Sequence, residues 1–355
     1  MKRPLIVMAV TGVLLMLTGG ILTAAAQWVT RDERWPMRGP WLWAVYKELP
    51  QFYRELNGID FGHAYLAETL LHTQDPQQVE QARQDVLDFI FSAPRVPPDE
   101  EMIAPTLTRM IWEAYKAFNW AHTFHRSVYD LYASGQVADK DSAVRQIFAD
   151  YIAKPEAITS HPLDLHGKLW SFPESQSFRD TFRKFNTQIW SYHWLQAATY
   201  DVQRMGNAAT QRELMPKLIE FYHGFLKNPP VEWQFMPMMA EGAPKFVGRF
   251  PAVAAVFDNL HMLHDNIDDI LSRPDLYPTL EVQRAAILKI LPIYLHRNHV
   301  PQDHYVEYHA PVIVEHAGMK DMGPRPPTAE QVLAGVVTRE GRSTEPATQP
   351  STGHH

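Results

Sequence analysis

The sequence predicts an all-α fold, and three observations support that prediction. Apolar residues recur at three- and four-residue spacing from about residue 60 onward, which is typical of helices with one buried face. No stretch shows the sustained alternation of apolar and polar residues that a strand requires. Long helical segments also alternate with shorter ones, which indicates an internal repeat. We therefore expect repeated helical hairpins packed as a bundle or a short α-solenoid, after an N-terminal transmembrane anchor or signal segment.

The N-terminal segment, residues 1–30, has the features of a membrane span. Lys2 and Arg3 precede a stretch without charged residues, and its apolar part, residues 5–22, is long enough to cross a bilayer. Three small residues at 24–26 also fit a signal-peptidase site. Two alternatives therefore stay open, a retained single-pass anchor and a cleaved signal. Both keep the basic end inside and place the bulk of the chain in the extracytoplasmic (periplasmic) space, secreted or periplasmic if cleaved.

Composition excludes several function classes. The chain of 355 residues is 45% hydrophobic, with a net charge of −7, so it can bury a large core and nothing suggests a nucleic-acid partner. It contains no cysteine, which rules out thiolate metal sites, iron–sulfur clusters, covalent c-type haem and disulfides. Glycine-rich phosphate loops and the nucleophile elbow are absent as well. The sequence therefore assigns no catalytic residue.

The chain divides into five parts by composition and spacing. After the anchor or signal, residues 31–57 form a juxtamembrane connector and a first helix. Residues 58–300 form the helical-hairpin repeat domain, and residues 301–323 form an ordered loop that contains histidine and methionine. Residues 324–355 are rich in proline and threonine with little to bury, so we expect this tail to be disordered.

Local signals mark the predicted helices. Asp75 with Pro76 is a helix start, and Gly206 follows a helix end. Proline breaks the chain after Phe91, and Pro292 bends the last helix. The predicted helices span residues 41–56 (disturbed at residue 50), 61–72, 76–91, 104–133, 141–153, 177–205, 208–226, 251–271 and 280–296.

One polar motif stands out in the helix at residues 251–271. The segment DNLHMLHDNIDDIL places His261, His264, Asp265 and Asp268 on one helical face, since about 100° separates successive residues. Two imidazoles and two carboxylates on one face are suitable ligands for a divalent transition metal.

The motif has relatives in two earlier helices. His122, His125 and Asp130 have the same spacing as His261, His264 and Asp269, that is, His, His three residues on, and Asp eight residues after the first. A weaker copy consists of His193, Gln196 and Asp201. We interpret residues 61–94 as a degenerate first unit, with His63 and His72 on its first helix.

This recurrence predicts a His/carboxylate metal site where the repeats meet. Facing helices of a bundle can complete one coordination shell with such pairs. Iron, zinc, manganese and copper all suit these ligands. The alternative is a structural seam, in which the same side chains hydrogen-bond across the repeats without metal. The predicted metal ligands are His122, His125, His193, His261, His264, Asp265 and Asp268.

A second histidine cluster lies in the C-terminal loop. Imidazoles with nearby thioethers favour copper, whereas an exposed histidine-rich loop without metal is the alternative. His161 and His166, in the loop at residues 155–173, are suited to either cluster. The cluster consists of His296, His299, His304, His309 and His316, followed by Met319 and Met322.

Two functional hypotheses follow. The first is an exported, membrane-anchored helical protein whose His/carboxylate site at the repeat seam serves redox chemistry or metal handling. The second is a non-catalytic accessory or scaffold subunit of a cell-envelope membrane complex. Both include the membrane as a partner through residues 1–30.

Overall fold

The computed structural model describes residues 42–163, 174, 176–229, 236–298 and 326–335. Within these residues the chain forms fifteen α-helices and one short 3₁₀ helix, with no strand beyond a single antiparallel bridge between Ile158 and Leu295. The predicted all-α class is thus confirmed for the described part of the chain.

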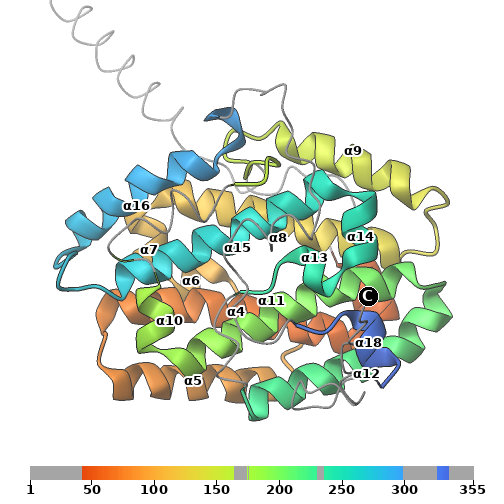
Figure 1. The fold of residues 1–355 in the computed structure, drawn as a ribbon, viewed down its shortest axis with the longest axis horizontal. Coiled ribbons are helices and arrows are strands. Elements are labelled where there is room, and N and C mark those ends of the chain that lie inside the picture. The colour runs from red at the N-terminus through yellow and green to blue at the C-terminus, as the bar shows by residue number, and fades with distance from the viewer. Residues whose placement is uncertain (1–41, 164–173, 175, 230–235, 299–325, 336–355) are drawn as a thin grey trace, which may run out of the picture. The chain divides into compact units, whose positions relative to one another are not determined.

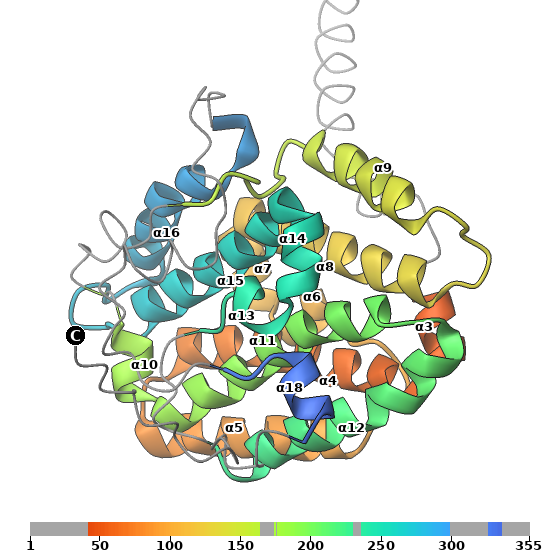
Figure 2. The same cartoon turned by 45° about the vertical axis from the view of Figure 1, so that its right-hand side comes forward.

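Four long helices form the interior, and each packs against the helix that follows it in sequence, which lies outside it (Figures 1 and 2). In the interior, α4 and α8 each lie against both α11 and α15. The interior is therefore a four-helix bundle rather than a row of stacked pairs. The long helices are α4 (Pro50–His72), α8 (Trp112–Ala133), α11 (Arg183–Arg204) and α15 (Pro251–Leu271). The outer helices are α5 (Pro76–Phe91), α9 (Lys140–Ile152), α12 (Ala208–Lys227) and α16 (Leu280–Tyr294).

Each long helix is preceded by one or two short helices and joined to them by a single non-helical residue. Leu49 and Phe250 make this joint before a proline, which disfavours helical angles in the residue ahead of it. Ile111 and Phe182 make it without a proline, so the expected unbroken helices at 104–133 and 177–205 are each interrupted. The short helices are α3 (Trp43–Glu48), α6 (Glu100–Ile103), α7 (Pro105–Met110), α10 (Ser177–Thr181), α13 (Met239–Gly242) and α14 (Pro244–Arg249).

Carboxylates near the C-terminal ends of the long helices hold these short helices in place. Each accepts backbone N–H groups at the start of a short helix, where a negative charge is favoured by the helix dipole. The exchange is reciprocal, because α4 caps the segment before α8 and α8 caps the segment before α4, and α11 and α15 do the same. The acceptors and their donor amides are Glu68 with Thr106 and Leu107, Asp130 with Trp43 and Val45, Asp201 with Lys245 and Phe246, and Asp269 with Gln176 and Phe178.

A short helix, α18 (Ala329–Leu333), lies inside the segment for which the sequence predicts disorder. It packs against α11 and α12. The indole N–H of Trp194, buried in α11, donates to the carbonyl oxygen of Pro327 at 2.7 Å. A buried indole needs such an acceptor. Composition cannot reveal this contact, because it depends on a side chain that is distant in sequence.

Several predicted features lie outside the described residues. They are the anchor or signal at 1–30, residues 31–41 of the connector, the loop at 301–323 and the remainder of the tail. Among the helices that the structure does describe, none combines the length and the apolar character needed to cross a bilayer.

Candidate metal centre

Equivalent positions of the four long helices meet in the middle of the bundle. Each long helix carries a pair of polar residues there, three positions apart. Three of the pairs were visible in the sequence, namely His122/His125, His193/Gln196 and His261/His264. The structure adds the fourth pair, Asp60 and His63 on α4. Asp60 lies eight residues before Glu68, and His63 lies five residues before it. Side chains three residues apart share a helical face, so each helix presents two polar groups to the interior.

Three imidazoles from three helices form the first ligand set. The candidate ligand nitrogens of His63, His193 and His264 all lie within 4.8 Å of one another. The Nε2 atoms of His63 and His193 are 3.0 Å apart, and the rings of His63 and His264 stack with centroids 5.0 Å apart. Zinc binds imidazole nitrogen at about 2.0–2.1 Å, so two ligands of one tetrahedral ion lie roughly 3.3 Å apart. Small side-chain movements would bring all three nitrogens onto one ion.

Two carboxylates and a histidine form a second set. Ligand atoms of Asp60, Glu100 and His122 also lie within 4.8 Å of one another. Glu100 opens the short helix α6, and its Oε1 lies 3.4 Å from Nδ1 of His122. Arg126, one turn after His122, forms an ion pair with Asp60. Because no motif surrounds Glu100 in the sequence, this residue was not predicted.

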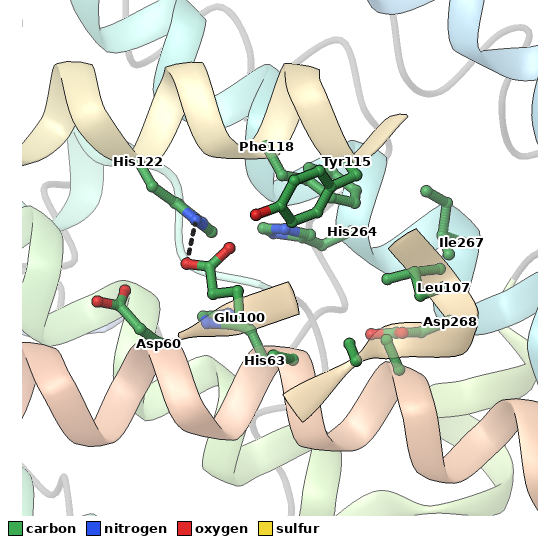
Figure 3. Close-up of a pocket in the computed structure, with 13 residues that line it drawn as sticks. Asp60, His63, Glu100, Leu107, Tyr115, Phe118, His122, His264, Ile267 and Asp268 are labelled. Carbon is green, nitrogen blue, oxygen red and sulfur yellow. Dashed lines mark ion pairs between the residues drawn. The ribbon is translucent and has the colours of Figure 1, made fainter. Parts of the chain in front are cut away.

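One cavity is bordered by His63 and His264 of the first set and by all three residues of the second set, as Figure 3 shows. Its volume is about 40 Å³, which is enough for a water molecule or a ligand of similar size. Phe118 and Tyr115 form part of its wall, and Asp268 reaches it from α15, one turn beyond His264. A small molecule in this space would touch both ligand sets.

Burial keeps the three imidazoles of the first set uncharged. It lowers the pKa of His63 to about 3, helped by the nearby His122, and it holds the pKa of His193 and His264 well below the ordinary value. A neutral imidazole has a free lone pair, so these groups can bind a cation near neutral pH without first losing a proton. Burial has the opposite effect on Asp268, whose pKa is raised well above the ordinary value.

Many ring nitrogens around the two ligand sets have no hydrogen-bond partner among the described protein atoms. They include Nδ1 of His193, His261 and His264, and Nε2 of His125. Buried polar atoms are almost always paired, so a group of unpaired ones requires an explanation. Coordination of a cation by part of the cluster supplies one.

The remaining predicted ligands lie beside the two sets and belong to neither. His261 stacks on His193 with the ring centroids 3.7 Å apart, and Nδ1 of His125 lies 2.8 Å from the hydroxyl of Tyr200. Asp265 is half-buried and is not a member of either set. Thus His122, His264 and Asp268 line the cavity and His193 belongs to the first ligand set, while His125, His261 and Asp265 neither line the cavity nor belong to a set.

The predicted loop cluster is only partly described. The rings of His161 and His296 are parallel, with centroids 6.2 Å apart. His166, His299, His304, His309 and His316, with both methionines, lie outside the described residues. The copper interpretation of this loop stays a prediction.

Each motif Asp eight residues after the first polar residue has a role outside the cavity. Asp130, Asp201 and Asp269 cap short helices, so the motif combines ligand positions and a structural position.

Comparison of the chain with protein-family models, with curated proteins and with solved structures found no match.

Proposed function

We propose that the chain binds a divalent transition metal through His63, His193 and His264. The observation that carries the proposal is the convergence of three uncharged imidazoles from three helices, with their candidate ligand nitrogens within 4.8 Å. Two imidazoles can share one proton in a hydrogen bond, but a third gains nothing from that arrangement. A bound cation would satisfy all three.

A three-histidine site lacks a negative charge, and a carboxylate beside the cavity can supply one. Neutral ligands leave both charges of the ion uncompensated, and an isolated charge is costly in a buried site. Asp268 borders the cavity with a raised pKa, so it would release its proton on metal binding and contribute a negative charge. The cavity also leaves a coordination position open, as in catalytic rather than structural metal sites. We therefore infer that the bound metal serves redox chemistry or metal handling, and that a small ligand can reach the open position. Zinc, iron, manganese and copper are the candidate ions.

We further propose that residues 58–300 consist of four repeated hairpins packed as a bundle. The common motif spacing, the outer helix after each long helix and the reciprocal caps support this interpretation. The repeat domain would be exported behind the membrane segment at residues 1–30. Similar losses in the free energy of unfolding when Asp130, Asp201 and Asp269 are each replaced by alanine would support the repeat.

Metal content tests the proposed site. The full chain is purified, stripped with a chelator and titrated with Co²⁺, whose absorption spectrum reports nitrogen ligands. We expect at least one ion per chain, with loss of the three-histidine spectrum in the double variant His63→Gln/His264→Gln. His72→Gln is the matched control, because that side chain is exposed and pairs with Glu68 outside the cavity.

The scaffold hypothesis makes the opposite prediction from the same variants. It is favoured by hydrogen bonds that join α8 and α11 beside the cluster, such as Tyr129 to the carbonyl of Gln196 at 2.7 Å and Gln203 to the carbonyl of Tyr129 at 3.0 Å. A wild-type chain that binds no ion, and a double variant that only melts lower, would refute the metal site. An accessory or scaffold role in an envelope complex would then be the better proposal.

A further inference from the structure

We infer that Asp60, Glu100 and His122 form a second cation site, so that a pair of ions lies beside the cavity. This inference rests on the proposed three-histidine site. It adds a binding position with a different donor set, two carboxylates and one imidazole. Such a set suits harder ions than three imidazoles do, with manganese, iron and zinc as candidates.

Three separate elements supply the ligands. Asp60 and His122 occupy the same motif position on α4 and α8, and Glu100 comes from α6, the short helix that precedes α7 and α8. Their ligand atoms lie within 4.8 Å of one another. All three border the same cavity as His63 and His264 (Figure 3).

His122 provides an independent sign of a ligand. Its side chain is buried, with 7% exposure for the whole residue. Its Nδ1 faces Glu100 at 3.4 Å without the geometry of a hydrogen bond. The dashed line in Figure 3 marks this approach, which is an ion pair when the imidazole is protonated. When the imidazole is neutral, its nitrogen and the carboxylate oxygen are placed as two ligands of one ion would be.

The two sets are close enough to act together. The ring of His122 lies 6.2 Å from that of His63 and 5.5 Å from that of His264, between ring centroids. Ions in two-metal sites are about 3.5–4 Å apart, and ligand rings on the two ions are further apart than the ions themselves. The carboxylates of Asp60 and Glu100 would also offset the charge of the first ion.

Arg126 occupies the cation position in the absence of the second ion. Its guanidinium pairs with Asp60 and lies 4.0 Å from Oε1 of Glu100. Two carboxylates this close together without a positive partner would repel each other. The second ion would therefore compete with Arg126 for the same oxygens. Arg126→Gln should lower the stability of the metal-free chain and increase the stabilisation that the second ion gives.

Manganese stoichiometry and magnetic resonance test the pair. The full chain is titrated with Mn²⁺ and examined by electron paramagnetic resonance. We expect two ions per wild-type chain with a spin-coupled signal. The double variant Asp60→Asn/Glu100→Gln should bind one ion with an uncoupled signal. Glu113→Gln, an exposed change on α8, is the control and should keep both ions.

The outcomes separate this inference from the proposed function. One ion in the wild-type chain, unchanged in the double variant, would refute the second site and leave the three-histidine site intact. No ion in the wild-type chain with either Mn²⁺ or Co²⁺ would refute both. Circular dichroism and melting of each variant establish that it is folded, and Arg126→Gln provides a further test. If that change leaves the melting-temperature increase by Mn²⁺ unaltered, Arg126 does not occupy the cation position.

Discussion

Burial changes the protonation of single side chains around the cavity. His125 illustrates the effect, because burial, together with the neighbouring His261 and His122, holds its pKa well below the ordinary value. It faces Tyr200, Tyr129 and the ring of Phe257, and none of these groups offers a negative charge. The folded protein therefore keeps this imidazole neutral at a pH at which the unfolded chain protonates it.

The pH dependence of stability follows from this shift. Below its unfolded pKa of about 6.5, His125 binds a proton only in the unfolded chain, so folding loses up to about 1.4 kcal/mol per pH unit. We expect the stability advantage of the wild type over His125→Gln to shrink as the pH falls from 7 to 5. Denaturant unfolding of both metal-free proteins at these values measures it. A constant difference between the proteins would contradict the shift.

At the scale of elements, the carboxylate caps fix where the short helices begin. Each cap joins one long helix to the short helix that precedes another long helix, so it links segments that are distant in sequence. Burial raises the pKa of Asp130 and of Asp269 to about 7, although the hydrogen bonds that these carboxylates accept from backbone amides lower it. The caps are therefore costly to bury, and they are retained because the amides would otherwise lack partners.

Removal of a cap should destabilise the fold without affecting metal affinity directly. We expect Asp130→Ala and Asp269→Ala each to lower the free energy of unfolding by about 1–3 kcal/mol, since each leaves buried amides unpaired. If the four hairpins are true repeats, Asp201→Ala should cost a similar amount. Asp88→Ala, on the outer face of α5, is the control. Losses confined to one position would argue against equivalent units.

Helix α4 approaches α11 closely at Gly62. A Cβ atom there would lie 2.8 Å from the hydroxyl oxygen of Tyr192 and 2.9 Å from its Cε2, and Tyr192 is fully buried. Although alanine favours helix by up to about 1 kcal/mol over glycine, overpacking typically costs about 1–3 kcal/mol.

We therefore expect Gly62→Ala to lower the melting temperature and to weaken metal binding, because it moves His63 relative to His193. Gly248→Ala is the matched control, since nothing lies within 4 Å of its added methyl group. Thermal melting and Co²⁺ titration of both variants measure the two effects. Equal behaviour of the two variants would show that the approach of α4 to α11 does not position the site.

At the scale of the whole molecule, the remaining prediction concerns location. The basic residues before the apolar segment predict that everything after it is exported. A reporter fused after Pro324 should be active only in the exported compartment, and the full chain should fractionate with membranes if the segment is retained. Cytoplasmic activity would overturn the predicted topology. Recovery in the soluble periplasmic fraction would instead identify the segment as a cleaved signal.

The sequence by itself determined most of the longer helices and the helix faces that carry polar groups, although it placed a break at residues 57–60 that lies inside α4. Apolar spacing is a local property, and so are Asp75 as a helix cap and the His-x-x-His spacing on α8 and α15. These features need only the neighbours along the chain, which is why the helix at Pro251–Leu271 was predicted with its observed ends. The same local character limits them, because a helical face does not reveal what lies opposite.

The tertiary structure decided which polar groups meet. Packing of α4 and α8 against both α11 and α15 brings His63 to His193 and His264, and it gives the motif carboxylates their capping role. Glu100 enters the centre because α6 packs against α4, and Arg126 reaches Asp60 from α8. Contacts of this kind depend on how separate elements pack, and residues 40 or 100 positions apart carry no spacing signal that could announce them.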